Sequence, residues 1–185
     1  MKRKKKRTNR KRVRITAALI FLAVYMAALV WVHGHLCRVD GGSMEPSYKN
    51  GDIVYTKTFS DDTAPAFGDV VVLDEPAGEN ASIPFLPWRA YLTKRVVGLP
   101  GDFLEGREDG LYRNGEILEE PYVASWEQKE YFAVELDEGE YFVLGDNRDG
   151  SYDSRNFGPV PERSIKRKIL KIIFGSGDAR TMNGT

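Results

Sequence analysis

Histidine and cysteine are scarce in this chain of 185 residues, which holds two histidines and one cysteine. Both histidines lie before residue 36, so no imidazole is available from any later motif. The single cysteine, Cys37, excludes a disulfide within one chain and leaves the redox compartment open. These three side chains also cannot supply the four ligands of a His/Cys zinc site. We therefore expect no metal and no other cofactor.

Acidic residues are absent from positions 1–14, which carry ten lysines and arginines. The net charge of the whole chain is zero, so the remaining residues carry a net negative charge of about ten. Residues 15–32 follow without any charge. A helix of that length spans roughly 27 Å, close to the hydrocarbon thickness of a bilayer, and its basic flank stays on the cytoplasmic side.

This pattern predicts a basic cytoplasmic tail at residues 1–14, a single transmembrane helix at 15–32 and an extracytoplasmic domain at 33–185. A nucleic-acid-binding arm is the alternative for the basic block, and a cleaved secretory signal is the alternative for the apolar run. The run is longer than a usual signal core, and residues 32–34 match an A-x-A cleavage site poorly. We therefore expect contact with a lipid bilayer and none with nucleic acid.

Short apolar runs between glycine, proline, asparagine and aspartate fill the rest of the chain, which predicts a β-rich domain. The predicted strands are residues 52–59, 69–73, 91–97, 102–105, 141–144 and 169–174. Asn114 and Gly115 predict a hairpin across residues 111–118, because Asn-Gly suits a type I′ turn. Residues 77–89 predict a loop, and residues 176–185 predict a frayed end. Residues 165–174 mix bases and aliphatics, which favours a last strand, with a membrane-surface contact as the alternative.

Three motifs place a serine, a lysine and a segment rich in acids and arginines in that order. They are residues 41–47 (GGSMEPS), 91–102 (YLTKRVVGLPGD) and 145–158 (GDNRDGSYDSRNFG). A serine hydroxyl becomes a good nucleophile only when a neighbour takes its proton. Without a later histidine, a lysine amine is the best remaining base, and Ser-Lys pairs are known variants of serine hydrolases. If Ser43 is the nucleophile, its base is therefore expected to be a lysine, and Lys94 in the second motif is the candidate.

Lys94 can accept a proton only when it is neutral, whereas the pKa of a free lysine lies near 10.4. Burial among apolar groups lowers the pKa of an amine, because it disfavours the ammonium form. Thr93, Val96 and Val97 supply apolar neighbours along the chain. We therefore expect Lys94 to be buried.

The three motifs, with Asn114-Gly115 and an E-P-Y triplet at residues 120–122 between the last two, resemble the bacterial type I signal peptidases of the Gram-positive type. They follow that family's order behind a transmembrane segment. The resemblance implies a mainly β, LexA/signal-peptidase-like catalytic domain with a small inserted β element at roughly 105–140. It also implies a membrane-bound serine endopeptidase that removes N-terminal signal peptides from exported preproteins after Ala-x-Ala.

The resemblance further implies roles for individual residues. Ser151 would lie beside Lys94 and orient its amine, and Asp153 and Arg155 would form a supporting ion pair. The backbone N–H of Ser43 would bind the oxyanion. Gly41 stands where some members carry a serine hydroxyl, so the second oxyanion donor is open. The candidate substrate-pocket residues are Val39, Met44, Tyr48 and Leu92.

Two other functions stay open. A self-cleaving repressor of the LexA-like class shares the Ser-Lys chemistry and the β fold, but it needs a DNA-binding domain where this chain has its apolar run. A non-catalytic or dedicated assembly factor, for example for pilus subunits, could use the same scaffold, although the intact Ser43 and Lys94 argue against a silent form. Other serine hydrolases fit poorly, because the chain has neither G-x-S-x-G nor S-x-x-K.

Overall fold

The computed structural model describes residues 2–60, 62–74, 91–125 and 131–175. The predicted loop at 77–89 and the predicted frayed end at 176–185 lie outside these ranges. The chain divides into two compact units, Met1–Leu36 and Cys37–Thr185, and each is described by itself.

The first unit is one helix, α1, Lys2–His35. Its segment Val13–Val32 has a mean hydropathy of 2.4, and none of this segment is buried within the structure. The predicted span at 15–32 falls inside it. The helix is thus long and apolar enough, by length and composition, to cross a membrane.

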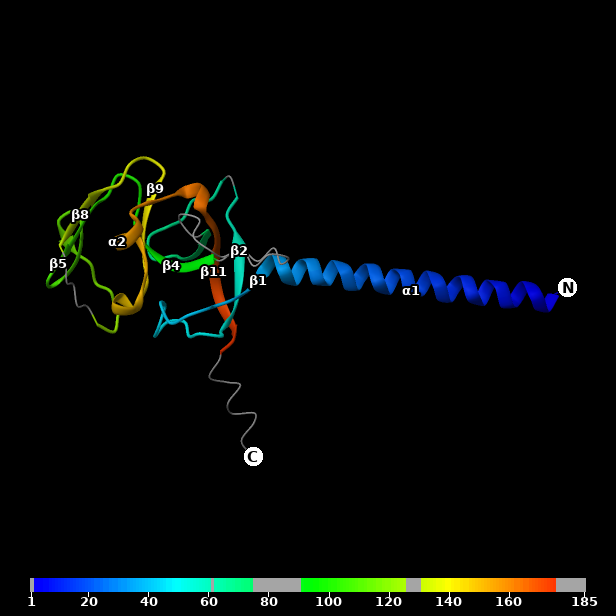
Figure 1. Ribbon diagram of the computed structural model, residues 1–185. Helices are drawn as coiled ribbons and strands as arrows, with labels where there is room; N and C mark the ends of the chain where they lie inside the picture. The colour runs from blue at the N-terminus through cyan, green and yellow to red at the C-terminus, as the bar shows by residue number, and fades with distance from the viewer. Residues whose placement is uncertain (1, 61, 75–90, 126–130, 176–185) are drawn as a thin grey trace, which may run out of the picture. The chain divides into compact units, whose positions relative to one another are not determined.

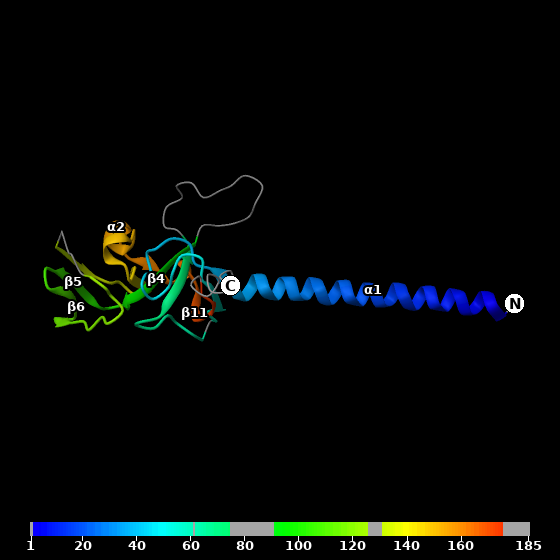
Figure 2. The ribbon, with the colours of Figure 1, turned by 90° about the horizontal axis from the view of Figure 1, so that it is seen from below.

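The second unit contains a seven-stranded sheet with the order β1-β2-β11-β3-β4-β9-β10 among the described residues. Figures 1 and 2 show this unit in two views. Its strands are β1 Leu36–Arg38, β2 Ile53–Thr58, β3 Val70–Asp74, β4 Tyr91–Gly98, β9 Glu140–Leu144, β10 Val160–Pro161 and β11 Ile165–Phe174. The central strand β4 pairs antiparallel with β3 and with β9. This pairing brings the lysine motif beside the start of the third motif.

A four-stranded sheet with the order β7-β6-β5-β8 follows β4 in the chain. Its strands are β5 Phe103–Arg107, β6 Gly110–Arg113, β7 Glu116–Ile117 and β8 Phe132–Glu135. In Figure 1, β5 and β8 lie on one side of β9, and β2 and β11 lie on the other. The predicted hairpin is confirmed, since β6 pairs with β7 across Asn114 and Gly115, whose φ angles are 54° and 85°.

All six strands predicted from punctuation are confirmed to within a few residues, and the last strand begins at Ile165. The pattern missed the short strands β1, β8 and β10. It also missed the short helices η1 Arg148–Gly150, α2 Ser154–Phe157 and η2 Glu162–Ser164. These elements are too short to display an apolar period.

Strand β3 is buried on both faces. Val71 and Leu73 pack in one hydrophobic cluster with Val96, and Val70 and Val72 pack in a second. A third cluster joins the two sheets through Val97, Leu104, Leu111, Leu136, Phe142 and Leu144. Each fully buried side chain of this size contributes about 1.5–3 kcal/mol. The clusters thus hold β4 firmly on both of its neighbours.

Candidate active site

The alternation of side chains along β4 sends Lys94 and Arg95 to opposite faces of the sheet. Lys94 lies opposite Val71 of β3, whereas Arg95 lies opposite Val70. Because Val71 and Val70 belong to different clusters, the two cations have different surroundings. Lys94 is only 2% exposed, which confirms the expected burial.

Ser43 and Lys94 lie in direct contact although 51 residues separate them. The Nζ atom of Lys94 donates a hydrogen bond of 2.9 Å to the Oγ atom of Ser43. Ser43 belongs to a turn segment that follows β1, and β4 supplies the lysine. This distance suits direct proton transfer between a nucleophile and its base.

Burial lowers the pKa of Lys94 to about 8, because the apolar surroundings disfavour its ammonium form. The charge of Asp153 opposes this shift, and the charge of Arg155 reinforces it. Among the described residues, no carboxylate forms an ion pair with Nζ. A substantial fraction of Lys94 is therefore neutral near pH 8 and able to accept a proton.

The third motif holds the backbone on both sides of the nucleophile. The backbone N–H of Asn147 donates to the carbonyl oxygen of Ser43 at 3.0 Å, and its side-chain amide donates to that of Gly42 at 3.1 Å. Gly145 faces the same site, where a Cβ atom would lie 2.5 Å from the carbonyl oxygen of Ser43 and 2.2 Å from the Oγ atom of Ser151. Only glycine fits there.

The predicted ion pair forms, with 2.9 Å between Arg155 Nε and Asp153 Oδ1. The Asp153 carboxylate also accepts a hydrogen bond from the Gly145 N–H at 3.0 Å and caps α2. Burial raises the pKa of Asp153, but the hydrogen bonds and charge of Arg155 and the Gly145 N–H outweigh it and lower the pKa overall. Ser151 is buried at its hydroxyl, beside Gly145, and that hydroxyl makes no hydrogen bond to Lys94 in this structure.

A second layer of charges supports this loop. The buried Arg148 forms a bidentate pair with Glu120 and donates from Nε to the Gly145 carbonyl at 3.0 Å. Arg95 forms a bidentate pair with the buried Asp146. These four residues lie in motifs of the sequence, but no local pattern indicates which of them pair. The apolar residues after Arg95 were an available clue that Arg95 is paired, because a buried cation needs an acid, whereas Arg148 lies in a polar run that offers none.

Comparisons with known proteins agree with this geometry. The family described as signal peptidase, peptidase S26, matches residues 11–174. The chain belongs to this family. It is 34% identical to a signal peptidase I of Bacillus amyloliquefaciens, over 97% of this chain and 98% of that protein. It is also 34% identical to signal peptidase I U of Bacillus subtilis strain 168, over 96% of this chain and 94% of that protein.

A solved signal peptidase I from Enterococcus faecalis is 32% identical, with a TM-score of 0.46, over 59% of this chain and 98% of that chain. The family resemblance predicted from the motifs is thus confirmed by sequence matches along nearly the whole chain.

The four candidate pocket residues of this signal-peptidase-family chain divide into two groups. Val39 and Met44 are fully buried in one cluster, with Tyr48 packed against it. Leu92 packs instead on the cluster of Val71 and Leu73, on the other face of β3. Gly41, where some members carry serine, has a φ of +84°, which favours glycine.

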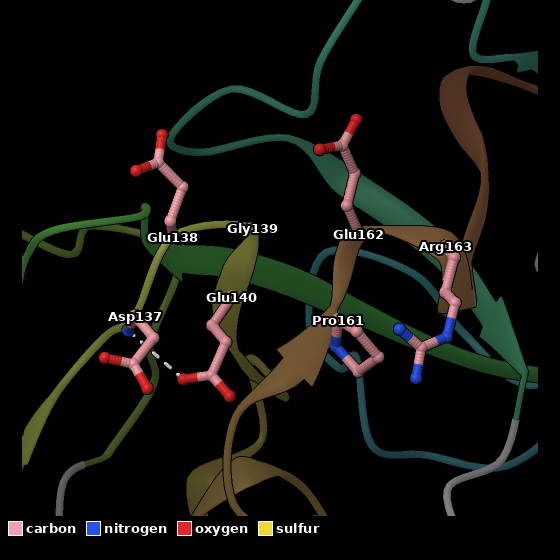
Figure 3. Close-up of a pocket in the computed structure, with 7 residues that line it drawn as sticks. All are labelled: Asp137, Glu138, Gly139, Glu140, Pro161, Glu162 and Arg163. Atoms are coloured by element: carbon pink, nitrogen blue, oxygen red, sulfur yellow. Dashed lines mark hydrogen bonds between the residues drawn. The ribbon is translucent and has the colours of Figure 1, made fainter.

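An open groove at the opposite end of β9 is rich in acids. It is lined by Asp137, Glu138, Gly139, Glu140, Pro161, Glu162 and Arg163 (Figure 3). Figure 3 shows the carboxylates of Glu138 and Glu162 pointing away from those of Asp137 and Glu140. Within the described ranges, no group of three or more His, Cys, Asp or Glu residues is arranged to hold a metal ion.

Proposed function

We propose that this chain is a membrane-bound serine endopeptidase that removes N-terminal signal peptides from exported preproteins after Ala-x-Ala. The observation that carries the proposal is the 2.9 Å contact between Ser43 Oγ and a buried Lys94 amine whose pKa is lowered to about 8. Family membership supports the same activity.

In the proposed reaction, neutral Lys94 takes the proton of Ser43 as Oγ attacks the scissile carbonyl carbon. The resulting oxyanion binds the Ser43 N–H, and the Lys94 ammonium then protonates the leaving amine. Water attacks the acyl-enzyme in a second cycle, with Lys94 again taking the proton. Ser151, whose hydroxyl makes no hydrogen bond to Lys94 in this structure, orients the amine once that hydroxyl turns toward Lys94, and Asp153 with Arg155 supports the loop behind it.

The substrate peptide lies in an extended conformation beside the nucleophile segment. Val39, Met44 and Tyr48 share one hydrophobic cluster and form one pocket for alanine, and Leu92, on the other face of β3, lines a separate one. The α1 helix crosses the bilayer once, with its basic end in the cytoplasm, because basic flanks remain inside. The catalytic unit is then extracytoplasmic, on the side where exported precursors emerge.

The test is cleavage of an Ala-x-Ala precursor by the full chain in detergent or lipid vesicles. Ser43→Ala and Lys94→Ala should each abolish cleavage while the far-UV spectrum stays unchanged. Ser47→Ala and Lys49→Ala are matched controls from the same segment and should cleave normally. Turnover by either dyad variant would refute the Ser-Lys assignment. A wild-type chain that binds precursors without cutting them would instead favour an assembly factor.

A further inference from the structure

Asn147 holds two successive carbonyl groups of the nucleophile segment. Its backbone N–H donates to the Ser43 oxygen at 3.0 Å, and its side-chain amide donates to the Gly42 oxygen at 3.1 Å. The two bonds come from different parts of one residue, so a side-chain substitution removes the Gly42 bond and leaves the Ser43 bond, and aspartate also keeps an oxygen for the Gly150 N–H. This difference allows the role of the Gly42 contact to be isolated.

The Gly42 contact fixes the direction of the Ser43 N–H. These two groups belong to the same peptide unit, and a trans peptide points its C=O and N–H in opposite directions. The cis peptide in the described chain is at Glu45-Pro46, so the Gly42-Ser43 unit is trans. Holding the Gly42 oxygen against Asn147 therefore turns the Ser43 N–H away from Asn147. No described group accepts a hydrogen bond from that N–H, which is left for a ligand.

The chain before Ser43 cannot fix this peptide unaided. Gly41 and Gly42 lack Cβ atoms, and glycine loses more conformational freedom on folding than any other residue. Gly41 already occupies a φ of +84°. An external contact is therefore needed to hold the plane of the Gly42-Ser43 peptide.

Asn147 is itself held in one orientation. Its Oδ1 atom accepts from the Gly150 N–H at 3.3 Å, which leaves the NH₂ group to face Gly42. The next residue, Arg148, is buried against Glu120 and the Gly145 carbonyl. The amide thus stands on a rigid support, as pre-organised sites require.

From this geometry we propose that Asn147 is a positioning residue that aims the Ser43 N–H at the oxyanion of the tetrahedral intermediate. The inference rests on the proposed function and extends it. Asn147 does not touch the substrate. It acts through the Gly42-Ser43 peptide and leaves the proton transfer to Lys94 unchanged.

The test compares Asn147→Ala and Asn147→Asp with wild type. Alanine has no side-chain donor, and an ionised aspartate has none either, so neither can donate to the Gly42 oxygen. Both variants keep the backbone hydrogen bond to Ser43. We expect kcat to fall by about 10- to 100-fold with KM nearly unchanged, a loss smaller than or similar to that of an oxyanion donor. The apparent base pKa in the pH profile should stay near its wild-type value.

A peptide aldehyde ending in Ala-x-Ala supplies the specific readout. Ser43 adds to its carbonyl carbon, and the oxygen that results occupies the oxyanion position, whereas the matching peptide amide is bound without this addition. The inhibition constant of the aldehyde should rise in step with the loss of kcat, and that of the amide should stay within twofold. Asn50→Asp is the matched control, since its exposed side chain only accepts a bond from Gly41 and keeps that ability.

The outcomes separate the inference from the proposed function. Wild-type kcat and aldehyde affinity in both Asn147 variants, with an active wild type and an inactive Ser43→Ala, would overturn the inference alone. Absence of cleavage by wild type would overturn both. Equal weakening of aldehyde and amide, or loss of the folded state in both variants, would show a merely structural role and also overturn the inference.

Discussion

Two charged side chains are buried to a similar degree in the β-rich unit, but they differ in the number of hydrogen bonds that surrounding residues make to them. Asp102, between β4 and β5, is 5% exposed, and Lys94 is 2% exposed. The Asp102 carboxylate accepts hydrogen bonds from the Leu99 N–H at 2.7 Å, Arg113 at 2.7 Å and Asn114 at 2.8 Å. Within the part of the chain that the structure describes, the Lys94 amine makes one hydrogen bond, to Ser43.

The pKa values follow from these partners. Burial alone would raise the pKa of Asp102, but the bonds from Arg113, Leu99 and Asn114 lower it overall and keep the group charged. Burial dominates at Lys94 and lowers its pKa to about 8. A charge at the junction of the two sheets is therefore satisfied, whereas the charge at the dyad is left poorly satisfied so that the amine can lose its proton.

The largest expected effect comes from removing the unfavourable charge. Lys94→Met should stabilise the fold by about 3 kcal/mol at pH 7, the cost that corresponds to lowering the pKa of a lysine from 10.5 to about 8. The unfolded chain binds more protons than the folded chain between these values, so wild-type stability rises with pH in that window. The gain should be complete below pH 8 and absent by about pH 10.5, as measured by urea unfolding. A gain that did not depend on pH would indicate better packing instead.

Gly145→Ala should lower kcat/KM by at least about 100-fold. The new Cβ atom would lie 2.5 Å from the backbone carbonyl oxygen of Ser43 and would displace the nucleophile segment. Gly106→Ala on β5 is the matched control, since its Cβ would lie 2.2 Å from the Phe132 ring. This variant should lower Tm and leave kcat/KM within about twofold. The comparison fails if both variants lose activity alike.

Asp102→Asn should destabilise the fold by about 1–3 kcal/mol at pH 7, because a charged acceptor of three bonds is lost. The pKa of Asp102 is lowered in the folded state, so its contribution is present above pH 4 and fades as the pH falls through the folded pKa. Cleavage by the folded variant should be unchanged. A specific loss of kcat would show that the two regions are coupled.

The smallest change among these experiments is the pH dependence of kcat/KM in the wild type, which alters no residue. Below a pKa of about 8, kcat/KM should fall by about tenfold for each unit of pH as Lys94 gains its proton, and above it the profile should level. Asp102→Asn should leave this profile in place. A kcat/KM that keeps rising to about pH 10 would show that the pKa of the Lys94 amine is not lowered in the working enzyme.

Local chemistry explains what the sequence could predict. Glycine and aspartate before β2 and β3 marked strand starts, and Asn114 with Gly115 marked its turn, because these residues carry backbone preferences of their own. The lack of a later imidazole pointed to a lysine base, and the family's motifs singled out Ser43 and Lys94 among the serines and lysines of the chain. The family's order of motifs supplied the ion pair of Asp153 and Arg155.

Long-range partners explain what the sequence left undetermined. Asn147 meets Gly42 from 105 residues away, and Arg148 meets Glu120 from 28 residues away. No apolar periodicity in the sequence indicates contacts between residues so far apart along the chain. An asparagine in a polar motif is usually a turn former. The four-residue helix α2 could have been found from its cap, because Asp153 and Asn156 form a reciprocal capping pair.

Successive side chains of β4 point to opposite faces of the sheet, and this alternation makes the strand sensitive to its register. Neighbouring positions on that strand hold one cation that can become neutral and one that cannot, because arginine keeps its charge at any physiological pH. A slip of one residue in strand pairing would exchange them and present a guanidinium to Ser43. Single-residue insertions or deletions within this strand should therefore silence the enzyme even where the sheet tolerates them, whereas changes in pairs should be milder.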